Sequence, residues 1–198
     1  MTRDLGCCQF ASVHAQMLEL AEAVRKGQSR GEIWLLEHHP VFTAGRATPQ
    51  ADLRDDIVAI ERGGQITYHG PGQLVVYPII PLPRRDVRAW LQALEQYGVA
   101  ICAGLGLLAE AGTDGTGVFV AGKKIASIGV AIRHWVNLHG IALNVAMDLT
   151  PFAQVRPCGK DPGLMSDLSR VAGRAITIEE VKQHARREVF LLTGPAPA

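Results

Sequence analysis

A cysteine between a proline and a glycine is the clearest candidate nucleophile in this chain. Cys158 stands in the sequence Pro157-Cys158-Gly159, where the proline restricts the backbone before the thiol and the glycine leaves room for a substrate after it. A cysteine thiolate can accept an acyl group from a thioester and hold it covalently. Most free cysteines are instead small buried hydrophobes. That alternative stays open for Cys158, and we adopt it for Cys102 in its apolar helical stretch.

Such a thiol needs a neighbouring cation, because a free cysteine with a pKa of about 8.5 is mostly protonated at neutral pH. A lysine ammonium would favour the thiolate, and the same lysine, once deprotonated, could take the proton of an incoming amine. Lys123 and Lys124 are consecutive in a strand-like stretch, so their side chains should point to opposite faces and only one can face a pocket. The alternative for Lys124 is an exposed lysine at a strand end.

A glycine-rich loop offers a second chemical feature, a wall that a ligand can approach closely. Residues 62–78 read RGGQITYHGPGQLVVYP, with glycines on both sides of Tyr68 and His69. Because glycine permits close backbone approach, N–H groups of this loop could face a substrate. An ordinary long hairpin loop is the competing interpretation. His69 could bind substrate, orient the loop or act as the base of a cysteine–histidine pair. Neither a dinucleotide-binding nor a P-loop fingerprint occurs.

The sequence gives little support for a metal site. His38 and His39 are adjacent in EHHPVFTAGR, but no partner stands at ligand spacing, so surface or pocket histidines are the favoured interpretation. The 4 cysteines include no CxxC pair, which argues against a zinc site. A chain of this length without an export signal does not suggest a disulfide framework, so free thiols are expected.

Length and composition narrow the class of protein. With 198 residues, 47% of them hydrophobic, the chain can bury a good core as one domain, 1–198. A formal net charge of +1 argues against nucleic-acid binding through a broad positively charged surface. The start, MTRDLGCCQF, lacks the apolar region of a secretory signal, and the apolar stretch Val99–Gly112 is too short to span a bilayer. We expect a cytoplasmic protein that binds neither nucleic acid nor membrane.

Hydrophobic periodicity predicts the elements that must position these groups. Helices are predicted over 10–24, over 87–108 with Asp86 as N-cap, and over 176–192 beginning with a capping box of Thr177 and Glu180. Strands are predicted over 32–37, 57–60, 74–77, 118–120, 124–133 and 138–145, with a hairpin turn at 121–123 and a helical turn at Thr150. Arg84, Arg85 and Arg88 crowd the start of the second helix. They could dock an acidic partner or form a solvated face.

Several long motifs, taken together, resemble the octanoyltransferases of lipoate biosynthesis, also called lipoyl(octanoyl) transferases. RGGQITYHGPGQLVVYPI, GKKIASIGV, NLHGIALNV and PCG occur in the order and spacing of that family, and EHHPVFTAGR fits as well. The resemblance extends from about Leu5 to the closing helix. It implies an α/β fold of the α+β type, in which a mixed sheet with flanking helices forms a core like that of biotin and lipoate protein ligases.

The resemblance also implies a reaction and its participants. An octanoyl group would pass from octanoyl-acyl carrier protein, through a thioester on Cys158 assisted by Lys124, to a lysine of a lipoyl domain. The implied acceptors are the lipoyl domains of 2-oxoacid dehydrogenase complexes and the glycine cleavage H protein. No ATP, metal or other cofactor is expected, since the donor thioester is already activated. The implied acyl pocket comprises Arg62, Gly63, Gly64, Gln65, Ile66, Thr67, Tyr68, His69, Ser127, Ile128, Gly129, Gly140, Ile141 and Ala142.

The chain departs from the family pattern at a few positions. Lys160 stands where the family usually has an apolar residue after PCG, Arg156 precedes the proline, and Asn137 replaces a frequent threonine. Lys160 could alter the local field. Three other functions remain possible on this fold: an ATP-dependent lipoate or biotin ligase, a non-catalytic binder of acyl chains or carrier protein, and a thioesterase.

Overall fold

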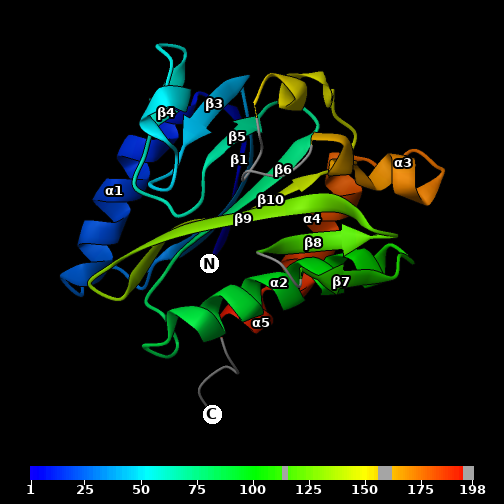
Figure 1. Cartoon of the computed structure of the whole chain (residues 1–198). Coiled ribbons are helices and arrows are strands. Elements are labelled where there is room, and N and C mark those ends of the chain that lie inside the picture. Colours follow the sequence, from blue (N-terminus) through cyan, green and yellow to red (C-terminus); the bar gives the residue numbers. More distant parts are fainter. Residues whose placement is uncertain (113–115, 156–161, 194–198) are drawn as a thin grey trace.

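The computed structural model describes residues 1–112, 116–155 and 162–193, which form two sheets flanked by helices (Figure 1). The larger sheet has the strand order β1-β2-β6-β10-β9-β8-β7, and the smaller one has the order β4-β3-β5. In the larger sheet β1 runs parallel to β2, whereas the other neighbours are antiparallel. This mixed α+β architecture is the one that the family resemblance implies.

The elements have the following bounds. The strands are β1 (Thr2–Cys8), β2 (Glu32–His38), β3 (Val41–Ala44), β4 (Ile57–Ala59), β5 (Ile66–His69), β6 (Gln73–Ile79), β7 (Ala109–Ala111), β8 (Gly117–Val120), β9 (Lys123–Arg133) and β10 (Val136–Asn144). The helices are α1 (Phe10–Arg25), α2 (Val87–Gly104), α3 (Leu168–Ala172), α4 (Ile178–Arg187) and α5 (Phe190–Thr193), with short 3-10 turns η1 (Gln50–Asp52), η2 (Thr150–Gln154) and η4 (Pro162–Leu164).

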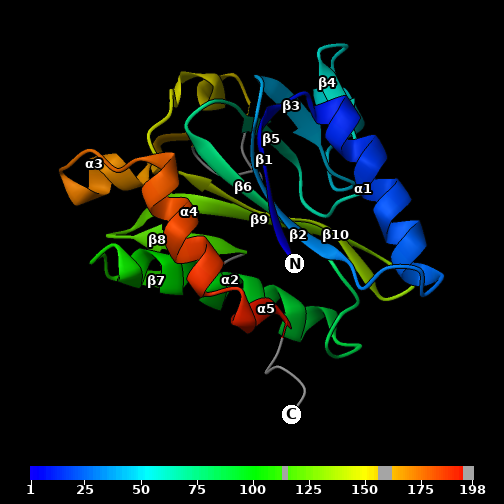
Figure 2. The same cartoon turned by 180° about the vertical axis from the view of Figure 1, so that it is seen from behind.

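Helices cover both faces of the large sheet, which explains why its central strands β6 and β10 are buried along their whole length. On one face α2, α4 and α5 pack together (Figure 2), and Leu74 and Val76 of β6 join their core. On the other face Val75 and Tyr77 pack with Met17 of α1. A strand buried on both faces reads as a continuous hydrophobic run rather than an alternating one. The small sheet lies on the same side as α1 (Figure 1).

The predicted helix starts are confirmed, but two helices end earlier than expected. The carboxylate of Asp86 accepts a hydrogen bond from the backbone nitrogen of Ala89 at 3.0 Å, as an N-cap should. The chain leaves α2 at Gly104 because Gly106 takes a left-handed conformation, with φ of 79°. The prediction that the helix continues to Leu108 is therefore wrong: Leu108 is exposed and β7 follows.

The closing helix is interrupted at Glu188, giving α4 and α5 instead of one element. Thr177 Oγ1 accepts from the backbone nitrogen of Glu180 at 3.1 Å, which is the predicted cap. The other half of a capping box does not form, since the Glu180 carboxylate pairs with Arg174 at 2.8 Å.

None of the helices in the described part of the chain has the length and apolar composition needed to span a membrane.

Candidate active site

A narrow slot lies between the large sheet and the loop that leads into β5. Its empty space, including the open mouth, is about 460 Å³. The slot lies on the α1 side of the sheet, since Val75 and Tyr77 contribute to its wall. Its lining consists of Ile60, Arg62, Gly63, Gly64, Thr67, His69, Val75, Tyr77, Ser127, Ile128, Gly129, His139, Gly140, Ile141 and Ala142.

Most of the acyl-pocket residues implied by the resemblance meet at this slot, although they come from three separate stretches of the chain. Three do not reach it. Gln65 and Ile66 line a different hollow beside η2, and Tyr68 packs against Phe152. Four lining residues are not among those that the resemblance implies: Ile60, Val75, Tyr77 and His139. For Val75 and Tyr77 a signal existed, because side chains two positions apart on a strand share a face.

The loop wall is held by Arg62, whose side chain is buried. Its guanidinium donates through Nη1 to the carbonyl oxygens of Gly63 at 2.9 Å and Gln65 at 2.8 Å. Through Nη2 it donates to Thr43, to the carbonyl oxygen at 2.7 Å and to Oγ1 at 2.9 Å. The backbone nitrogen of Gly63 reaches the Val130 carbonyl of β9 at 2.9 Å. Arg62 therefore fixes the shape of the loop against the sheet.

Two glycines of the slot are required by close approach. A Cβ atom on Gly129 would lie 2.9 Å from Cδ of Arg62, so this position leaves room for the arginine to cross β9. A Cβ atom on Gly140 would lie 2.2 Å from the carbonyl oxygen of Val76 in the neighbouring strand. The contact at Gly140 is with backbone and requires a strand to move, whereas the contact at Gly129 requires the Arg62 side chain to shift.

A chain of hydrogen bonds determines the tautomer of His69. The Asn144 amide nitrogen donates to the carbonyl oxygen of Ser166, so Asn144 Oδ1 is left to accept from Gln73 Nε2 at 2.9 Å. Gln73 Oε1 then faces His69 Nδ1 at 2.7 Å. Because an amide oxygen can only accept, His69 Nδ1 carries the proton and Nε2 is left with its lone pair.

Burial keeps His69 and His38 neutral. Desolvation lowers the pKa of His69 to about 3 and that of His38 to about 4, since the interior disfavours the charged imidazolium. His38 Nε2 lies 3.0 Å from the hydroxyl of Tyr77, whose pKa is raised by burial. A histidine with so low a pKa is a poor proton acceptor at neutral pH. His69 is therefore better suited to accept a hydrogen bond from a ligand than to serve as a base.

Lys124 is buried at the start of β9, whereas Lys123 is exposed. The expectation that the two side chains point to opposite faces is confirmed. Lys124 Nζ donates to the carbonyl oxygen of Thr116 at 3.2 Å and lies 5.9 Å from the centre of the Phe119 ring. Gly117 leaves space for this side chain, since a Cβ there would meet Lys124 Cε at 2.7 Å.

The predicted nucleophile Cys158, like Arg156 and Lys160, lies outside the described residues. The next described residues, from Pro162 onward, contact the start of β9. Met165 forms a parallel bridge with Lys124, and Lys123 Nζ donates to the carbonyl oxygen of Gly163 at 2.9 Å. The described cysteines Cys7, Cys8 and Cys102 are free thiols. Cys102 is buried, which raises its pKa to about 12, as expected for a thiol that only fills space.

The mixed sheet, the slot on its α1 side and the glycine loop define a protein of the lipoate and biotin protein ligase fold. The match to lipoate-protein ligase A bound with ATP has a TM-score of 0.72 and 18% identity, covering 98% of this chain and 84% of that one. A bi-partite lipoate protein ligase from Thermoplasma acidophilum matches with a TM-score of 0.70 and 18% identity, covering 90% of this chain and 79% of that one.

Sequence comparison makes the assignment more specific. Residues 11–190 match the model of the lipoyl protein ligase A/B catalytic domain. An octanoyltransferase of Geobacter metallireducens is 40% identical over 203 residues, which covers 100% of this chain and 95% of the relative. One from Geobacter sulfurreducens is 44% identical over 184 residues, covering 90% and 78%. The chain belongs to the lipoyl protein ligase A/B catalytic-domain family and, within it, to the octanoyltransferases, as the sequence motifs predict.

Proposed function

We propose that this protein transfers an octanoyl group from octanoyl-acyl carrier protein to a lysine of a lipoyl domain, through a thioester on Cys158. The observation that carries the proposal is the similarity over the whole chain to proteins named octanoyltransferase. The slot supports the proposal, because its lining is largely apolar. The lining includes Ser127 on β9, the strand that also carries Lys124.

The proposed first step acylates the enzyme. The Cys158 thiolate attacks the carbonyl carbon of the carrier thioester, a new C–S bond forms, and the bond to the carrier sulfur breaks. The Lys124 ammonium stabilises the attacking thiolate and gives its proton to the departing thiolate. The acyl chain lies in the slot between the glycine loop and β10. Backbone N–H groups hold the oxyanion of the tetrahedral intermediate.

The proposed second step transfers the acyl group to nitrogen. The ε-amine of the acceptor lysine attacks the thioester carbonyl, an amide bond forms, and Cys158 leaves as the thiolate. Neutral Lys124 takes the proton that the amine loses, which restores the starting ion pair. Because both steps exchange acyl bonds, no ATP or metal takes part in this reaction. The proposed acceptors are lipoyl domains of 2-oxoacid dehydrogenase complexes and the glycine cleavage H protein, in the cytoplasm.

The mass of the intact protein after mixing with octanoyl-acyl carrier protein tests the first step. We expect a gain of one octanoyl group, located on Cys158 by peptide mapping and lost on addition of a lipoyl domain. Cys158→Ala should show no gain, and Cys102→Ser should behave as the original chain does. An unmodified Cys158, or an adduct that lipoyl domain cannot discharge, would rule out the proposed path.

The competing functions predict other products. An ATP-dependent ligase would consume ATP with free octanoate and need no cysteine nucleophile. A thioesterase would release free octanoate even when a competent lipoyl domain is present. A binding protein would form neither a covalent adduct nor a product. Measuring ATP turnover, free octanoate and octanoylated lipoyl domain in one assay separates the four.

A further inference from the structure

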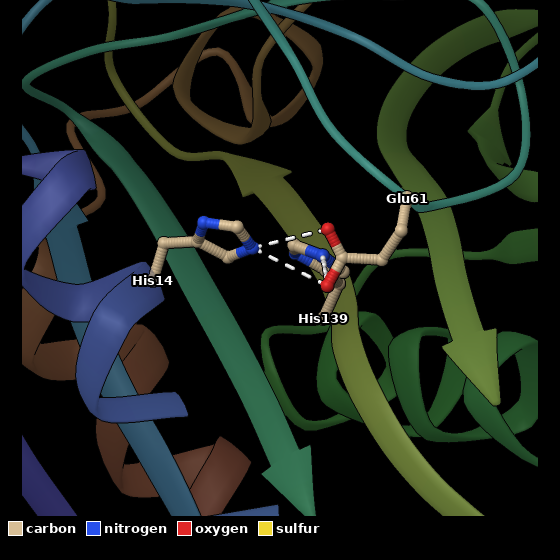
Figure 3. A group of neighbouring side chains, drawn as sticks. All are labelled: His14, Glu61 and His139. Carbon is tan, nitrogen blue, oxygen red and sulfur yellow. Dashed lines mark hydrogen bonds and ion pairs between the residues drawn. The ribbon is translucent and has the colours of Figure 1, made fainter. Parts of the chain in front are cut away.

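Two histidines and a glutamate from distant parts of the chain converge beside the slot (Figure 3). His14 extends from α1, Glu61 from the loop after β4, and His139 from β10. His14 Nε2 lies 3.1 Å and 3.3 Å from the two carboxylate oxygens of Glu61. His139 Nε2 lies 3.6 Å from the nearer of these oxygens. One ligand atom of each residue lies within 4.8 Å of the others.

The contact of His139 with Glu61 is the loosest in this group, at an ion-pair distance of 3.6 Å. The His139 side chain is 2% exposed, and among the described residues no hydrogen bond reaches its Nε2 atom. The residue also has φ of 61°, an uncommon conformation for a side-chain-bearing residue within a strand. A buried polar atom without a partner destabilises a fold by about 1–3 kcal/mol. This nitrogen is aimed at the Glu61 carboxylate at a distance too long for a hydrogen bond.

We propose that His14, Glu61 and His139 bind a divalent transition-metal ion of the Zn²⁺ type. Two imidazoles and a carboxylate form a donor set that Zn²⁺ accepts in proteins. With bonds of about 2.0–2.1 Å, two ligands of a tetrahedral ion are about 3.3 Å apart. From the Oε1 atom of Glu61, the observed separations are 3.3 Å to His14 Nε2 and 3.6 Å to His139 Nε2, close to that value. The fourth position is left for water.

The position of the site indicates a structural role. His139 pairs with Val130 on β9, six residues from Lys124, which corresponds to roughly 20 Å along a strand. The ion would therefore lie away from the proposed acyl chemistry. It would join α1, the loop before the glycine wall and β10, next to the slot residues Ile60 and Gly140. The sequence could not predict this site, because its ligands do not stand at the short spacings of metal motifs.

The Arg133 side chain would compete with a metal ion for the Glu61 carboxylate. Its Nη2 atom lies 3.7 Å from the Glu61 carboxylate, and its side chain is half exposed. A guanidinium so close repels a metal cation, although an exposed side chain can turn into solvent. The buried Arg62 guanidinium is the other nearby positive charge, and its position is fixed by the loop carbonyls. Removing the charge of Arg133 should therefore strengthen metal binding without altering a ligand.

Titration of chelator-treated protein with Co²⁺, followed by displacement with Zn²⁺, tests the proposal. We expect one equivalent to bind with visible d–d absorption and no thiolate charge-transfer band. His14→Gln and Glu61→Gln should lose at least about 100-fold in affinity, whereas Arg133→Gln should bind more tightly than the original chain. Circular dichroism should show that each variant is folded.

A surface site provides the matched control. Cys7 Sγ lies 3.8 Å from His39 Nδ1 on the exposed surface, where a metal could bind adventitiously. The double variant Cys7→Ser with His39→Gln should leave the Co²⁺ spectrum and affinity unchanged. Absence of saturable binding, a thiolate band, or equal affinity in His14→Gln would each overturn the proposal.

Discussion

The backbone nitrogen of Ser166 donates a hydrogen bond to the carbonyl oxygen of Lys124 at 3.0 Å. The Ser166 carbonyl oxygen in turn accepts from Asn144, the first link of the chain that ends at His69 in the slot. One buried polar network therefore connects the slot with the strand position that carries the proposed proton donor. Fully satisfied networks of this kind hold their members in a single geometry.

Replacing Lys124 by alanine should slow octanoylation of Cys158 about 10²–10⁴-fold, the usual contribution of a positioned acid or base. Without the ammonium the thiol pKa should rise, so the pH profile of alkylation by iodoacetamide should move to higher pH. Lys123→Ala is the matched control, because Lys123 is the exposed neighbour on the opposite face. At saturating carrier protein it should react at the original rate. Equal losses in both variants, or an unmoved pH profile in Lys124→Ala, would contradict the assigned role.

The neutral buried histidines predict how stability depends on pH. The folded pKa values of His69, about 3, and His38, about 4, lie below the value of about 6.5 expected when unfolded. Between about pH 6.5 and pH 4 the unfolded chain therefore binds more protons. The free energy of unfolding should fall as pH drops through this window, by about 1.4 kcal/mol per pH unit for each histidine. Above it their contribution is constant.

Urea denaturation between about pH 7.5 and pH 5, with chelator present, measures this slope. His69→Gln should reduce it by the contribution of one histidine, and His39→Gln, at an exposed position, should not. A slope that His69→Gln leaves unchanged would show that the pKa of this imidazole is the same in the folded and unfolded states, which would contradict the lowered pKa.

Gly140→Ala should destabilise the protein by at least about 1–3 kcal/mol, because overpacking against backbone cannot be relieved by a side-chain rotation. The new methyl would lie 2.2 Å from the Val76 carbonyl oxygen in the centre of the sheet. Gly63→Ala is the control from the opposite wall, where the nearest atom is the Val130 carbonyl oxygen at 3.8 Å. It should change the free energy of unfolding by less than about 0.5 kcal/mol. Similar values for the two variants would refute the close-approach argument.

The elements that sequence predicts well are those whose signals are local. α1 and α2 have long apolar stripes, α2 has a capping aspartate, and β9 and β10 are extended apolar runs joined by a short turn. β1 was missed because it is an edge strand with mostly exposed or half-buried residues, so it has no apolar run. β5 was missed because the glycines around it favour a loop, whereas pairing with β3 buries all its residues.

The site shows the same division between local and tertiary information. Conformationally special glycines identify the loop wall and the close passage at Gly140, since only glycine leaves that space. The meeting of β6, β9, β10 and the loop at one slot depends on strand order, which no single stretch contains. His139 could not be placed for that reason. The proximity of Cys158 to Lys124 stays a prediction.

The arginines at the start of α2 provide a last test, of where the carrier protein binds. The Arg85 guanidinium lies 5.7 Å from the centre of the Trp135 ring. Trp135 is in the turn between β9 and β10. Lys124 is at the other end of β9, which at about 3.3 Å per residue is some 30 Å away. Reversing the charge of Arg84, Arg85 and Arg88 together should therefore change the KM for carrier protein, and its salt dependence, by less than about twofold. Lys123→Glu, beside Lys124, should raise the KM and alter its salt dependence. A larger effect from the triple reversal than from Lys123→Glu would place the docking surface at the remote end of the sheet.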